Sequence, residues 1–269
     1  MAYQRIDCAS WDKLIEEVMR STRDFEKRYS SSAVPFFRGH SKPSFQLLSG
    51  LHRPRSGQFY NEDHEKKFYY NEYDEKNFYY EFRARAGALL NPGFSSWDVL
   101  FLMQHHGIPT RLLDWTESFA TALFFALEGA TSDVDIWMLD PYLLNDQVAS
   151  TQDIMDVESN FPAEYFDLFI DPNSSGKRPP WSVVAIYPRR QIARLASQHG
   201  LFTLHLSNKA LEDFEEPWLT RFRLAGPAGA EASRFLKVMG VNDFSLFPDL
   251  DGLSRFLRGR IKGGYGIVA

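Results

Sequence analysis

The stretch that decides the fold is Gln104–Ala126, QHHGIPTRLLDWTESFATALFFA. Polar and charged side chains crowd the junction between a short apolar run and an apolar helix. A helix that only fills a core has no use for such groups. The N-terminus of a helix offers free backbone N–H groups and the positive end of the helix dipole. The pattern therefore indicates a ligand-binding or catalytic site where this helix begins.

Signals for both helices and strands flank this stretch. Helices are expected at about 10–19 with Ser10 as cap, 94–106 with Ser95 or Ser96 as cap, 117–128 with Asp114 or Thr116 as cap, 191–199, 229–239 and at the C-terminal end. Strands are expected at 34–40, 111–114, 134–141, 182–188, 200–207 and 218–224. The two types mix without regular βαβ spacing, which favours an α+β fold over a doubly wound sheet. We expect one domain over residues 1–269.

Two segments depart from this pattern. Residues 60–70, YNEDHEKKFYY, are nearly repeated at 70–80 as YNEYDEKNFYY. We interpret about 59–90 as a long, aromatic-rich helix with Phe68, Phe78 and Phe82 facing inward; the alternative is an exposed aromatic and acidic surface that binds a partner. Residues 152–181 read as an acidic connector rich in Pro, Gly and Ser.

The composition excludes several classes of protein. The chain has 269 residues, is 44% hydrophobic and carries a net charge of −5, so it is neither disordered nor broadly nucleic-acid-coating. Cys8 is its only cysteine, which excludes an intrachain disulfide and a cysteine zinc cluster. No apolar run reaches the length of a membrane span, and the first residues lack the plan of a signal peptide. We expect a soluble, cytoplasmic protein.

Five ordered blocks resemble those of the FRG domain family, named after an aromatic-Arg-Gly motif. They are Phe37-Arg38-Gly39, the QHxGxPTRLLDWT block with its ALFFA helix, IWMLDP at 136–141, RxxxQxGxFTxH at 194–205 and LFPDLDGL at 246–253. The resemblance runs from about Trp11 to Leu257. One departure is Phe119, at a position where members often have Pro.

The layout of the family is similar to that of ADP-ribosyltransferases. The resemblance implies a split, mainly antiparallel sheet flanked by helices, with a site between the 34–40 strand and the turn at 104–116. It implies that Phe37, Arg38 and Gly39 bind NAD, that Thr116 precedes a helix of AxxF form, and that Gln198 stands where the superfamily usually has Glu.

Arg38 follows an apolar run and precedes Gly39. A guanidinium can fork onto a diphosphate, and a glycine leaves room for a ligand near the backbone. The alternative is a structural arginine paired with a carboxylate such as Asp114. Both interpretations stay open at this point.

His105 ends a helix beside a cluster of polar residues, which makes it a catalytic candidate, whereas His106 is the weaker one. Arg111 and Asp114 lie three residues apart: they either pair and pin the turn, or Arg111 holds a phosphate while Asp114 orients His105 or a ribose hydroxyl. Adjacent histidines lack the i, i+4 spacing of two metal ligands on a helix, so no metal is expected.

Trp115 is either core or a stacking surface for a nicotinamide or base, and Thr116 is a helix cap or a ligand contact. Thr110 belongs to the same cofactor-binding set. Gln198 can hydrogen-bond a ribose but cannot act as a general base. The sequence offers other carboxylates, Glu212, Glu215, Glu216 and those of 152–164, and a basic spot at Arg189, Arg190 and Arg194 that either touches nucleic acid or is solvated surface.

The leading hypothesis is an NAD-dependent ADP-ribosyltransferase, a toxin-like effector of phage defence or of a toxin–antitoxin locus. Its catalytic residues would be Arg38, His105, Asp114 and Gln198, its acceptor a nucleic acid or a protein, and its partner an antitoxin or chaperone. Two alternatives remain: a nucleotide-binding module that senses NAD without turning it over, and a metal-independent RNase-like toxin that uses His105 and Arg38.

Overall fold

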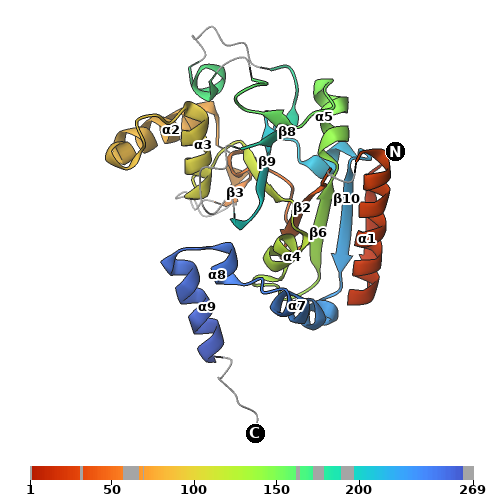
Figure 1. Cartoon of the computed structure of the whole chain (residues 1–269). Helices are drawn as coiled ribbons and strands as arrows, with labels where there is room; N and C mark the ends of the chain where they lie inside the picture. Colours follow the sequence, from red (N-terminus) through yellow and green to blue (C-terminus); the bar gives the residue numbers. More distant parts are fainter. Residues whose placement is uncertain are drawn as a thin grey trace.

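The computed structural model describes residues 2–30, 33–56, 67–68, 70–161, 164–171, 179–188 and 197–262. An eight-stranded sheet forms its centre, and helices cover both faces (Figure 1). The strand order is β1-β10-β6-β2-β5-β9-β8-β7. Only the two edge pairs, β1/β10 and β7/β8, are parallel, so the sheet is mainly antiparallel. The expected α+β class is confirmed.

The strands of this sheet are β1 (Gln4–Cys8), β2 (Phe36–His40), β5 (Leu112–Thr116), β6 (Val134–Leu139), β7 (Met155–Asp156), β8 (Val183–Tyr187), β9 (Gly200–His205) and β10 (Leu219–Leu224). A separate ribbon pairs β3 (Arg55–Ser56) with β4 (Lys67–Phe68). The helices are α1 (Trp11–Arg28), α2 (Glu72–Ala86), α3 (Ser96–His105), α4 (Phe119–Leu127), α5 (Pro141–Ala149), α7 (Gly229–Val238), α8 (Asp243–Leu246) and α9 (Leu250–Lys262). A π-helix spans Phe166–Ile170, and short 3-10 turns lie at Gly50–His52, Gly87–Leu89, Leu211–Phe214 and Gly226–Ala228.

Three apolar clusters hold the layers together. Helices α1, α4 and α7 pack with β2, β6 and β10. Helices α2 and α3 and the π-helix pack against β8, β9 and the start of β5. The third cluster joins α5 to side chains from the centre of the sheet, among them Phe36, Trp115 and Trp137. The central strands are thus buried on both faces, which explains their near-continuous apolar sequences.

Several expected boundaries need correction. Helix α1 does not end where its charged continuation starts but runs to Arg28, because Leu14, Val18 and Phe25 keep one face buried. The long aromatic helix is wrong at residues 67–68, which form strand β4, and α2 starts after Asn71. Residues 57–66 and 191–196 lie outside the described residues, so the start of that helix and most of the one expected at 191–199 stay predictions.

The cap of α4 also differs from expectation. Ser118, rather than Asp114 or Thr116, caps the helix by accepting from the backbone of Thr121. Asp114 and Thr116 belong instead to strand β5, which ends before Ser118. This leaves the Asp114 side chain free of a capping role. None of the helices in the described ranges is long and apolar enough to cross a membrane.

Candidate functional site

The sheet divides between β2 and β5. Strand β2 pairs with β6 along its whole length, Phe36–His40, but pairs with β5 at one position only, Phe37 opposite Thr116. Beyond that pair the two strands separate, and a cavity of about 850 Å³ opens beside them. Its walls come from β2 and the loop after it, the end of α3, β5, one side of α4, Gln198, and Phe202 of β9.

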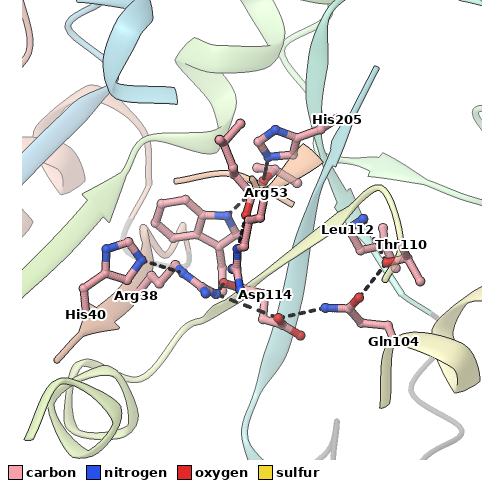
Figure 2. Close-up of polar contacts among 11 residues, drawn as sticks. Arg38, His40, Arg53, Gln104, Thr110, Leu112, Asp114 and His205 are labelled. Atoms are coloured by element: carbon pink, nitrogen blue, oxygen red, sulfur yellow. Dashed lines mark hydrogen bonds and ion pairs between the residues drawn. The ribbon is translucent and has the colours of Figure 1, made fainter. Parts of the chain in front are cut away.

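The Arg38 guanidinium bridges the gap between the two strands (Figure 2). Its Nη1 donates to the backbone carbonyl of Asp114 and lies 3.8 Å from the carboxylate oxygen Oδ2 of the same residue. Its Nε donates to Nε2 of His40 at 3.1 Å. The side chain is 17% exposed, and burial lowers the pKa of Arg38 to about 10, with the charge of Arg53 acting in the same direction and Asp114 opposing it. Arg38 stays charged at neutral pH.

Two neutral histidines lie behind this guanidinium. His40 accepts a hydrogen bond from Arg38, so its Nε2 carries no proton, and burial together with Arg38 and Arg53 lowers its pKa to about 2. His205 lies 3.0 Å from the hydroxyl of Thr203, and burial lowers its pKa to about 3. Neither imidazole adds positive charge or supplies a proton near neutral pH.

Asp114 presents its carboxylate to the cavity with its side chain 56% exposed. Gln104 donates to Oδ2 from Nε2 at 2.8 Å, and Gln104 in turn accepts from the Thr110 hydroxyl at 2.5 Å (Figure 2). Among the described residues lining the cavity, Asp114 is the one carboxylate. It faces two guanidiniums, those of Arg38 and Arg53, so the cavity carries net positive charge and suits an anionic ligand.

Residues 34–134 match the family model described as "FRG domain". The chain carries an FRG domain. The matched segment contains all the residues that line the cavity except Gln198 and Phe202. No curated protein and no solved structure matches the chain.

Arg111 of the FRG domain does not reach the cavity, contrary to the expectation that it holds a phosphate. It is 4% exposed and forks onto Glu75 of α2, from Nε at 2.8 Å and from Nη2 at 2.6 Å. Tyr165 donates to the same carboxylate. Burial lowers the pKa of Arg111, but the Glu75 charge outweighs it and the net shift is upward. The alternative expectation, a pair with Asp114, is also wrong.

The structure requires a glycine at position 39 for a different reason from the one expected. A Cβ atom there would lie 1.9 Å from the carbonyl oxygen of Ala122 and 2.5 Å from the backbone nitrogen of Ala126. The missing side chain thus admits helix α4, rather than a ligand, against strand β2. Phe37 seals the same contact edge-on against Phe119, with ring centroids 5.9 Å apart. The aromatic-Arg-Gly motif therefore docks α4 through its first and third residues and points its second toward the gap.

Thr116 ties the cavity wall to Gln198. Its hydroxyl donates to the backbone carbonyl of Gln198 at 2.7 Å and accepts from the backbone of Ser118 at 3.0 Å. The side-chain amide of Gln198 donates to the carbonyl of Leu246, in the C-terminal LFPDLDGL block. His199, directly after it, adopts a left-handed conformation with φ of 48°. Backbone strain of this kind often accompanies functional sites.

The remaining expected residues differ in where they lie relative to the cavity. His105 and Trp115 line the cavity, His105 half-buried and Trp115 buried with its indole N–H donating to Thr203 at 3.0 Å. Thr110 acts behind the wall through Gln104. Glu212 accepts from the backbone of Leu47, and Glu215 pairs with Arg5, so neither supplies a carboxylate to the cavity. Arg189, Arg190 and Arg194 lie outside the described residues.

Sequence reasoning missed three cavity residues of consequence. Gln104 opened the decisive stretch but received no role, because its partner Asp114 lies on another element, strand β5, and no local periodicity links the two residues. His40 follows Arg38 by two residues and so shares its side of the strand, a signal that the alternation of β2 contained. Arg53 lies in a turn-rich loop with no periodicity, and nothing in the sequence around it indicated the cavity.

Proposed function

We propose that this FRG domain protein binds NAD in the cavity between β2 and β5 and transfers ADP-ribose to a macromolecule. The observation that carries the proposal is the pair of arginines, Arg38 and Arg53, in one wall with an oriented, exposed carboxylate, Asp114, beside them. The guanidiniums match a diphosphate, and the carboxylate matches the positive charge that develops on a ribose. The volume of about 850 Å³ suits a nucleotide-sized ligand.

The reaction would break the bond between the ribose and the nicotinamide of NAD. Nicotinamide leaves with the bonding electrons, and the ribose passes through an oxocarbenium-like state before a nucleophile of the acceptor bonds to the same carbon. Asp114 would stabilise that cation and take the proton of the acceptor group. Arg38, held by His40 and by the Asp114 carbonyl, would fix the diphosphate. Trp115 lines the wall beside this carboxylate, where a ring could pack.

The geometry favours a role for the buried groups in holding the ligand rather than in transferring protons. The neutral state of His40 and His205 excludes them as general acids at neutral pH, so among the described residues that line the cavity Asp114, His105 and His106 are left to exchange a proton, with the arginines serving as charges. The setting we propose is a cytoplasmic, toxin-like effector of phage defence or a toxin–antitoxin system, with a neutralising protein partner. A nucleic acid or a protein would be the acceptor.

A second function has an observation in its favour. Gln198 takes the place expected of a catalytic Glu, and its amide is already engaged by the Leu246 carbonyl. An FRG domain that binds NAD and senses it without turnover would need no carboxylate there. Turnover separates the two functions, because only the transferase releases nicotinamide.

The test measures NAD binding by calorimetry and nicotinamide release by chromatography on the same preparations. Arg38→Ala and Arg53→Ala should each weaken binding at least fivefold, and Asp114→Asn should bind NAD but release nicotinamide at least a hundredfold more slowly. Arg85→Ala is the matched control, since Arg85 is 81% exposed on α2 and pairs with Glu81. Binding without release in the wild type would favour the sensor. RNA shortened while NAD stays intact would favour an RNase.

A further inference from the structure

We propose that Gln104 is a positioning residue that holds the Asp114 carboxylate back from Arg38, and so keeps Arg38 available to an anionic ligand. The inference rests on the anion-binding half of the proposed function and not on ADP-ribose transfer. It concerns three side chains that meet in the wall of the cavity, from α3, β5 and β2 (Figure 2).

The distances show a carboxylate shared unequally between two donors. Oδ2 of Asp114 lies 2.8 Å from Nε2 of Gln104 and 3.8 Å from Nη1 of Arg38. A full hydrogen bond between a guanidinium and a carboxylate has a length of about 2.7–2.9 Å. The stronger electrostatic partner is therefore the more distant one, about 1 Å beyond bonding range, while the neutral amide makes the close contact.

The orientation of the Gln104 amide follows from its other neighbour. The hydroxyl of Thr110 accepts from the backbone N–H of Leu112 at 3.1 Å, so its own hydrogen is available to Oε1 of Gln104. With Oε1 accepting from Thr110, the NH₂ group faces Asp114. The chain Leu112, Thr110, Gln104, Asp114 thus runs in one donor-to-acceptor direction. Strand β5 anchors both of its ends.

Arg38 cannot readily move toward the carboxylate, whereas the carboxylate can move toward Arg38. The guanidinium is fixed by the Asp114 carbonyl and by His40, and its side chain is 17% exposed. The Asp114 side chain is 56% exposed, and Gln104 is its close hydrogen-bond partner. Loss of the Gln104 amide would let the carboxylate turn onto Nη1. The resulting ion pair would compete with any anion that approaches Arg38.

The test is a double-mutant cycle on ADP binding, measured by calorimetry at low salt, because ADP supplies a diphosphate without a reactive nicotinamide. Gln104→Ala should weaken ADP binding about fivefold, the order expected for a partly exposed ion pair that must be broken. Asp114→Asn should bind ADP as tightly as the wild type or more tightly. In the Asp114→Asn background, Gln104→Ala should have no further effect, since no carboxylate is left to block Arg38.

Gln147→Ala is the matched control, because Gln147 is an exposed residue of helix α5 that does not line the cavity. Thermal unfolding of each variant shows that the fold is intact. A merely structural role for Gln104 would weaken ADP binding equally in both backgrounds, and that result would overturn the proposal, as would a wild type that does not bind ADP. Wild-type binding with the predicted cycle but no nicotinamide release from NAD would support Gln104 and refute the transferase instead.

Discussion

Replacing Gly39 by alanine gives the sharpest test of how strand β2 and helix α4 build the cavity. The new Cβ would lie 1.9 Å from the carbonyl oxygen of Ala122, where an ordinary contact is about 3.4 Å. Helix and strand would have to separate by about 1.5 Å, because both clashing atoms, of Ala122 and Ala126, belong to the backbone and cannot rotate away. Overpacking of a core costs about 1–3 kcal/mol. We expect the upper end of this range or more.

The control is Gly87→Ala at the end of α2. A Cβ there meets nothing within 4 Å, and its φ of −40° and ψ of −51° suit alanine. This variant should be neutral or gain about 0.4–1 kcal/mol, because alanine restricts the unfolded chain. Urea denaturation of both variants measures the difference in free energy of unfolding, which should reach about 3 kcal/mol. A Gly39→Ala protein as stable as the control would refute the close packing of α4 on β2.

Two further predictions concern buried charge and pH. Glu75→Gln should lower the free energy of unfolding by about 3–5 kcal/mol, because it leaves the Arg111 guanidinium buried without its counter-ion. The control Glu81→Gln, in an exposed pair with Arg85, should lower it by under about 1 kcal/mol. Equal losses for the two variants in urea denaturation would contradict the buried pair. His205 has a folded-state pKa of about 3, below the ordinary 6.5, so the unfolded chain binds the extra proton: the contribution of His205 to stability is fully present above pH 6.5 and falls by up to about 1.4 kcal/mol per pH unit as pH drops from 6.5 toward 3, and His40 adds a contribution of the same sign. His205→Asn should reduce the slope of stability against pH between pH 6.5 and 5 by up to about 1.4 kcal/mol per pH unit, while the part due to His40 remains, and an unchanged slope would show that His205 is not held neutral.

Local sequence signals predicted most of the elements that surround the cavity. Short apolar runs placed β2, β6, β8, β9 and β10, and a serine cap placed α3, near their observed bounds. The repeat led to the prediction of one long helix over about 59–90, because both copies carry the same aromatic spacing. The second copy alone has a carboxylate, Asp74, three residues after its asparagine, which forms a capping box with Asn71 and starts the helix. In the first copy, Asn61 is followed three residues later by His64.

The misses at the site share a physical cause, which is pairing between distant segments. The partner of Arg111 is Glu75, 36 residues earlier, and no local pattern shows that both become buried. Gly39 looked like a gap for a ligand because a sequence does not reveal which backbone approaches it. Arg38 and Asp114 were expected in one site, and the single β2–β5 pair, Phe37 with Thr116, is what brings them together.

The most direct test of the central claim follows the two halves of NAD through one reaction. NAD labelled on its adenylate half and, separately, on its nicotinamide half is incubated with the protein and a cell lysate. We predict that the adenylate label becomes bound to acid-precipitable nucleic acid or protein, that the nicotinamide label is released free, and that Asp114→Asn abolishes both. NAD that stays intact, with neither label redistributed, would contradict the assignment of the Arg38–Asp114 cavity as a site of ADP-ribose transfer.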